Sequence, residues 1–230
     1  ILFEIYKKAV LSFKSPIALL GFTQNSIIEG DKDLDLYDLS SDWNINSDWK
    51  LYRTYKSIIS TRCPYFSKDP ERFFLKCHKY LQDDGEIFID FSLGDNWRFK
   101  NFKIGWKKNG EHEYAYKENN LLWSTVWDDE FLNHPHFIKF SQMVEKFGYN
   151  DVKSAILQEV PSIISLSYIK KLFDIQYDLL SLWEDSPQLY IFIKGKKKKE
   201  EILKIGDLVR VIYGIPQYIP GIPFADNKVG

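Results

Sequence analysis

Residues 56–91 contain the pattern that most constrains the fold of this chain. The apolar run at 57–60 predicts a short buried strand, and the apolar run at 86–91 predicts a second one. Between them lies a segment with the apolar spacing of a helix. A strand, a helix and a second strand in this order are typical of one α/β crossover, which joins two parallel strands.

The helix of this crossover is predicted over residues 69–82. Ser67 or Asp69 can accept a hydrogen bond from a free N–H group of the first turn, and Pro70 suits the first helical position. Gly85 is predicted to end the unit, because glycine tolerates the positive φ of a helix C-terminal turn. The buried face of the helix is predicted to consist of Phe73, Phe74, Cys77 and Leu81.

The remaining patterns extend this alternation along the chain. Strands separated by helices or loops predict a mainly parallel, three-layer α/β sheet. The predicted helices span 2–13, 137–147 and 169–182, and the further predicted strands span 17–21, 34–40, 152–160 and 187–195.

The domain organisation is predicted to be a single domain over residues 1–230 with two decorations. Residues 92–136 interrupt the α/β alternation and are interpreted as an aromatic-rich insertion, a flap or a lid. Residues 200–230 combine proline and glycine with apolar residues and are interpreted as an extended C-terminal tail. The tryptophans of the insertion are Trp97, Trp106, Trp123 and Trp127.

Composition excludes several classes of partner. The net charge is -1, from 31 basic and 32 acidic residues, which favours neither nucleic acid nor an anionic membrane. No apolar run is long enough for a transmembrane helix. Two cysteines make no disulfide framework, so a cytoplasmic location is expected. The basic run at 196–199 is interpreted as a solvated strand end, with a phosphate-binding patch as the alternative.

Three segments, taken in order, resemble the class I S-adenosylmethionine-dependent methyltransferases. They are IALLGFTQNSIIE, LDLYDLS and DPERFFLKCHKYLQDDGEIFIDF. The resemblance covers residues 15–91 and 137–195, where 152–160 and 189–194 resemble the last two strands of the family, a reversed pair. It implies a Rossmann-like methyltransferase sheet, mostly parallel with a reversed C-terminal strand, and S-adenosylmethionine as cofactor.

The resemblance also implies which residues contact the cofactor. Asp38 follows the second predicted strand, where the family uses a carboxylate to accept both ribose hydroxyls. Gly21 matches the first glycine of the family's glycine-rich loop, but Thr23 and Asn25 stand where further glycines are usual. The loop after the third strand contributes Arg62 and Tyr65.

Two carboxylates are the candidates for catalysis. Asp90 and Asp95 are expected at the carboxyl edge of the sheet, where either could orient the acceptor or act as a general base. The alternative for Asp95 is a turn cap paired with Arg98.

Two other kinds of chemistry compete with simpler explanations. Cys63 would need a nearby base to act as a nucleophile, and His78 on the following helix is interpreted instead as structural. His134 and His136 have suitable atoms for a metal, but nothing in the spacing fixes the geometry, so no metal is predicted.

The predicted function is S-adenosylmethionine-dependent methyl transfer to a small organic or sugar-like acceptor. The alternative is a binding or structural module of the same fold that has lost the cofactor, as the missing glycines suggest. A nucleotide-sugar or NAD enzyme is disfavoured, because no Gly-x-Gly-x-x-Gly motif follows the first strand. The expected partner is a small-molecule substrate. If the C-terminal tail serves assembly, the chain is expected to form a homo-oligomer.

Overall fold

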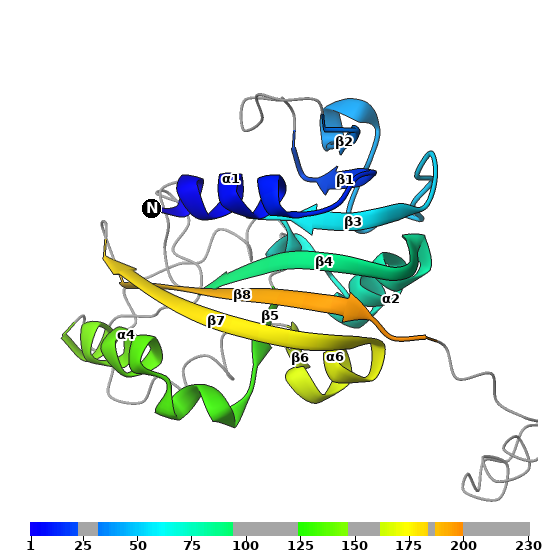
Figure 1. The fold of residues 1–230 in the computed structure, drawn as a ribbon. Helices are drawn as coiled ribbons and strands as arrows, with labels where there is room; N and C mark the ends of the chain where they lie inside the picture. Colours follow the sequence, from blue (N-terminus) through cyan, green and yellow to red (C-terminus); the bar gives the residue numbers. More distant parts are fainter. Residues whose placement is uncertain (23–31, 94–123, 147–161, 184–186, 200–230) are drawn as a thin grey trace, which may run out of the picture. The chain divides into compact units, whose positions relative to one another are not determined.

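The computed structural model describes residues 1–22, 32–93, 124–146, 162–183 and 187–199 (Figure 1). The chain divides into two compact units, Ile1–Lys198 and Lys199–Gly230. The predicted tail at 200–230 and the predicted strand at 152–160 lie outside the described residues. The elements below all belong to the first unit.

A six-stranded sheet lies at the centre of this unit, in the order β2-β1-β3-β4-β8-β7 (Figure 1). The first four strands in this order run parallel, and β8 runs antiparallel to both of its neighbours. The predicted α/β class, mostly parallel with a reversed C-terminal strand, is therefore confirmed. The strands are β1 (Ile17–Leu20), β2 (Leu34–Tyr37), β3 (Tyr55–Ser60), β4 (Leu81–Leu93), β7 (Phe173–Trp183) and β8 (Pro187–Lys197).

Helices cover both faces of the sheet, which gives three layers. Alternation along β1 shows the division: Ile17 and Leu19 pack in the same cluster as helix α1, whereas Ala18 and Leu20 pack in the cluster of the opposite face. The helices are α1 (Leu2–Ser12) on the first face, and α2 (Pro70–Tyr80), α4 (Pro135–Lys146) and α6 (Leu166–Leu172) on the second.

Helix α2 begins as predicted. The Asp69 carboxylate accepts the N–H of Arg72 at 2.9 Å, and Pro70 occupies the first turn. Ser67 is not the cap, because its hydroxyl donates instead to the carbonyl of Asp69. The predicted buried face is confirmed, since Phe73, Phe74, Cys77 and Leu81 are all buried.

The turn after α2 differs from the prediction in one respect. The residue with positive φ is Asp84, at 64°, and not Gly85. Glycine is needed at 85 for space, because a β-carbon there would lie 2.9 Å from the carbonyl oxygen of Gln82 and 2.9 Å from the Leu81 side chain.

The prediction of a helix over residues 169–182 is wrong for most of this range. Helix α6 ends at Leu172, and β7 then pairs with β8 along its whole length. Residues 173–179 alternate strictly between apolar and polar positions with a period of two, which is the pattern of a strand with one covered face. The reversed pair at the end of the sheet is therefore β7 and β8.

The described part of the predicted insertion is helical and extended. Strand β5 (Ser124–Trp127) pairs in parallel with β6 (Ser162–Ser165), and the 3₁₀ helix η4 (Asp129–Asn133) leads into α4. The predicted hairpin around 109–110 lies outside the described residues. None of the helices in the described ranges is both long and apolar enough to cross a membrane.

The edge strand β2 is fastened to the start of β3 by polar side chains. Arg53 donates to Asp33 and, at 2.9 Å, to Asp35. Tyr55 donates to Asp35 at 2.7 Å and lies 2.5 Å from the Tyr37 hydroxyl. These contacts hold an edge strand that has only one paired neighbour.

We expect the substitution Phe74→Ala to reduce the free energy of unfolding by about 3–5 kcal/mol, as for other buried phenylalanines. Phe74 is fully buried and contacts the rings of Phe91 and Phe173. Leu75→Ala on the same helix is the control, since Leu75 is 47% exposed, and should change stability by less than about 1 kcal/mol. Urea denaturation measures both, and equal losses would contradict this assignment of the core.

A second prediction concerns pH. The hydrogen bond from Arg53 holds the pKa of Asp33 below its ordinary value of 3.8. Its contribution to stability is therefore present above pH 3.8 and is lost as pH falls through the lower folded pKa. The melting temperature of the wild type should fall more steeply between pH 5 and pH 2.5 than that of Arg53→Met. In an Asp33→Asn background, most of this difference should vanish.

Candidate functional site

The strand order reverses between the neighbouring strands β1 and β3. After β1, the chain adds β2 on one side of the sheet, and after β3 it adds β4 on the other side. In open α/β sheets, ligands bind in the crevice outside the carboxyl ends of the strands at such a switch point. The candidate site therefore lies beyond Leu20 and Ser60, whose strand ends are joined by a hydrogen bond from the Ser60 hydroxyl to the Leu20 carbonyl at 3.1 Å.

Gly21 directly follows β1 at this edge. Its φ of 84° is in the left-handed region, and a β-carbon at this position would lie 2.5 Å from the β-carbon of Cys63. Its N–H donates to the Tyr37 carbonyl at 2.7 Å, and the N–H of Phe22 donates to the same oxygen at 3.3 Å. Both the backbone conformation and the close approach of Cys63 thus require glycine here.

Asp38 directly follows Tyr37 at the carboxyl end of β2. Asp38 caps the 3₁₀ helix η1 (Leu39–Ser41). One of its carboxylate oxygens accepts the N–H of Ser40 at 3.1 Å, and its own N–H donates to the Ser41 hydroxyl. The residue is half-buried. Since the Tyr37 carbonyl also receives the N–H of Gly21, the structure brings the two predicted residues Gly21 and Asp38 to one place.

Arg62 and Asp90 meet behind this edge. Arg62 follows β3 with a positive φ of 55°, and its N–H donates to the Asp90 carboxylate at 2.6 Å. The other oxygen of Asp90 accepts the hydroxyl of Tyr6, on α1, also at 2.6 Å. Burial, reinforced by the Asp90 charge, raises the pKa of Tyr6 well above its ordinary value, so its hydroxyl remains a donor.

The rest of the loop after β3 turns into the core. Tyr65 is fully buried and its ring centroid lies 4.7 Å from that of Phe66. His78, on α2, is also buried, and its Nε2 lies 3.2 Å from the carbonyl of Lys198, the residue after β8. The ring of His78 is thereby used in joining α2 to β8.

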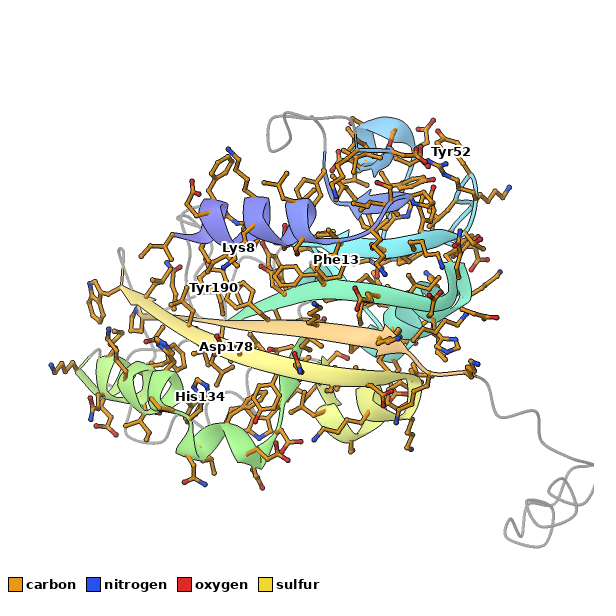
Figure 2. All side chains as sticks on the ribbon, in the orientation of Figure 1. Lys8, Phe13, Tyr52, His134, Asp178 and Tyr190 are labelled. Carbon is orange, nitrogen blue, oxygen red and sulfur yellow. The ribbon has the colours of Figure 1, made fainter. Side chains whose placement is uncertain are left out.

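The histidine pair weighed as metal ligands is attached to strand β7. His134 lies next to Asp178, with 3.5 Å between Nε2 and the carboxylate (Figure 2). Nδ1 of His136 lies 3.1 Å from the Ser181 hydroxyl. Within the described residues, no group of three or more histidine, cysteine, aspartate or glutamate side chains is arranged to hold a metal.

Three of the predicted site residues, Thr23, Asn25 and Asp95, lie outside the described residues. Two polar clusters were not predicted: the Tyr6–Asp90 pair and the Tyr37–Tyr55 hydroxyl pair. The signal for the first pair was present, because a tyrosine in the buried stripe of a helix and an aspartate in an apolar strand both need polar partners when buried.

No family model and no curated protein matches the chain. Solved structures with a similar arrangement include an S-adenosylmethionine-dependent methyltransferase from Thermotoga maritima, described as a possible histamine N-methyltransferase. The two chains are 12% identical, with a TM-score of 0.30. The match covers 72% of this chain and 64% of that chain. A candidate methyltransferase from Bacillus halodurans C-125 has 11% identity and a TM-score of 0.38, over 84% of this chain and 97% of that one. Both are described as methyltransferases.

We expect Gly21→Ala to destabilise the protein in two separable ways. The left-handed backbone costs a non-glycine residue about 1–2 kcal/mol, and the clash with Cys63 adds a further overpacking cost of about 1–3 kcal/mol. Introducing Gly21→Ala into a Cys63→Gly background should remove the second cost only. A double-mutant cycle by chemical denaturation measures the coupling. Equal costs in the two backgrounds would show that the Gly21–Cys63 contact is not tight.

Proposed function

We propose that this chain catalyses S-adenosylmethionine-dependent methyl transfer to a small organic or sugar-like acceptor. The observation that supports the proposal best is the joint placement of Gly21 and Asp38 at the switch point of the sheet, around the carbonyl of Tyr37. We expect the partner to be a small-molecule acceptor.

Asp38 fits the cofactor's ribose. It stands at the carboxyl end of a strand, half-buried, and the N–H of Ser40 fixes one of its oxygens. In other doubly wound folds, a carboxylate in this position accepts ribose hydroxyls. Holding the carboxylate by a cap fixes its direction before a ligand arrives, which lowers the entropic cost of binding.

Gly21 fits less simply. The space that its missing side chain leaves is filled by Cys63, so a cofactor at this edge would meet the Cys63 side chain beside the glycine backbone. We infer that Arg62 and Cys63, together with Gly21, form the wall of the cofactor site nearest to β1 and β3. Tyr65, three residues after Arg62, is fully buried in the core.

The chemistry asks little of the protein's own acid–base groups. When bound, S-adenosylmethionine supplies a methyl group that its sulfonium already activates. The chain then has to hold the acceptor nucleophile in line with that group and to exclude competing geometries. Asp95, which follows β4 in the sequence, keeps its proposed role as the carboxylate that orients the acceptor or accepts its proton.

The alternative is a binding or structural module that has kept the fold and lost the cofactor. One observation favours it: packing against Cys63 accounts for the glycine at position 21 without any ligand. The two functions differ in whether the Asp38 edge binds the cofactor at all.

Isothermal titration with S-adenosylhomocysteine tests the proposal. We expect binding by the wild type, and an affinity at least about tenfold lower for Asp38→Asn, since an amide keeps the cap but loses one acceptor oxygen. Asp42→Asn is the matched control, because Asp42 is exposed and has a left-handed φ that asparagine tolerates. It should bind as the wild type does.

No binding at millimolar cofactor would reject methyl transfer and favour the alternative. Binding that Asp38→Asn leaves unchanged would place the ribose elsewhere.

A further inference from the structure

One buried carboxylate joins three separate elements of the fold. Asp90 is fully buried in β4, on the face that α1 covers. It accepts the Tyr6 hydroxyl from α1 and the Arg62 N–H from the loop after β3, each at 2.6 Å. These donors lie 84 and 28 residues away in the sequence, so the contact is a tertiary link and not a local turn.

The link to Arg62 stabilises an unfavourable backbone conformation. A non-glycine residue with a φ of 55° is strained and persists only where the surrounding contacts determine its conformation. The hydrogen bond from its N–H to a carboxylate is charge-assisted and therefore strong. The next residue, Cys63, is the one that packs against Gly21. The position of the Cys63 side chain thus depends on the conformation that Asp90 holds at Arg62.

The link to Tyr6 fixes the carboxylate itself. The Tyr6 ring packs edge-on against Phe192, with centroids 6.4 Å apart, and the hydroxyl reaches Asp90 from there. Tyr190 lies on the side of the sheet that α1 covers, in one cluster with Tyr6 (Figure 2). Its hydroxyl donates to Gln188, two residues away on its own strand, at 3.1 Å. Tyr6 and Tyr190 are thus two buried tyrosines in one cluster with different hydroxyl acceptors.

We propose that Asp90 is a positioning residue, which transmits the docking of α1 through Tyr6 to the loop at Arg62 and Cys63 and so sets the wall of the cofactor site. This role rests on the proposed function and differs from the catalytic role first expected for Asp90. It follows that α1 and a ligand at the site stabilise each other, because both favour the same loop conformation.

The reactivity of Cys63 reports the loop position without any cofactor. The chain has two cysteines, and Cys77 is fully buried, so alkylation by iodoacetamide under native conditions reports Cys63. Tyr6→Phe removes only the hydroxyl that holds Asp90. Tyr190→Phe removes a buried hydroxyl from the same cluster and is the matched control.

We expect Tyr6→Phe to raise the alkylation rate of Cys63 about fivefold. This is the factor that corresponds to a hydrogen bond of about 1 kcal/mol. Tyr190→Phe should change the rate less than twofold, and Cys63→Ser should abolish the fast labelling. Equal rates in the two tyrosine variants would overturn the proposal, since loss of stability alone would affect both.

Substitutions of Asp90 supply a second arm. Asp90→Asn keeps an acceptor oxygen for the Arg62 N–H and should restore most of the protection that Asp90→Ala loses. The amide proton of Arg62, followed by NMR in the Tyr6→Phe and Asp90→Asn variants, should move upfield as the charge-assisted bond weakens. Unchanged Arg62 shifts in both would also overturn the proposal, even if Asp90→Ala does not fold.

The cofactor arm separates this inference from the function on which it rests. Affinity for S-adenosylhomocysteine should fall about fivefold in Tyr6→Phe and remain within twofold in Tyr190→Phe. If the wild type does not bind the cofactor while Cys63 responds as expected, the proposed function fails and the positioning of the loop stands. If binding is normal in all variants and Cys63 does not respond, the positioning role fails alone.

Discussion

The burial of Asp90 is the constraint on which the arrangement around the candidate site depends. Burying a carboxylate costs free energy unless hydrogen-bond donors compensate for the lost water. Removing one donor destabilises the protein more than the intact interaction stabilises it. Asp90 accepts hydrogen bonds from a helix at the start of the chain and from a loop after β3. One acid residue therefore links α1 to the loop after β3, in addition to the apolar packing of α1 on the sheet.

The sequence predicted the parts of the fold that local chemistry decides. Asp69 and Pro70 were sufficient to locate the start of α2, because capping depends on neighbouring residues alone. The failure at β7 shows the limit of this approach. Residues 173–179 alternate between apolar and polar positions, but the leucines at 179, 180 and 182 interrupt this alternation and also fit a helical period. Only pairing with β8 makes the strand the better solution.

The candidate site was predictable to a similar extent. Gly21 and Asp38 follow strands and are identified by that position, since the carboxyl ends of parallel strands meet at one edge. The contact of Cys63 with Gly21, and that of Tyr6 with Asp90, join residues 42 and 84 positions apart. No periodicity or motif encodes such pairs. These contacts follow from the order of the strands in the sheet. That order depends on all the contacts of the folded chain together and not on any local pattern.

For the methyl transfer that we propose, residue identity alone says little about catalysis. A reaction whose group is already activated needs a fixed geometry more than a strong base. Here two residues with positive φ, Gly21 and Arg62, lie at the ends of neighbouring strands, with Cys63 packed against the glycine. Strained backbone persists only where surrounding contacts determine it, and Asp90 supplies such a contact at Arg62. In the positioning role that we propose, the buried acid acts through the backbone that it holds and not through a proton that it transfers.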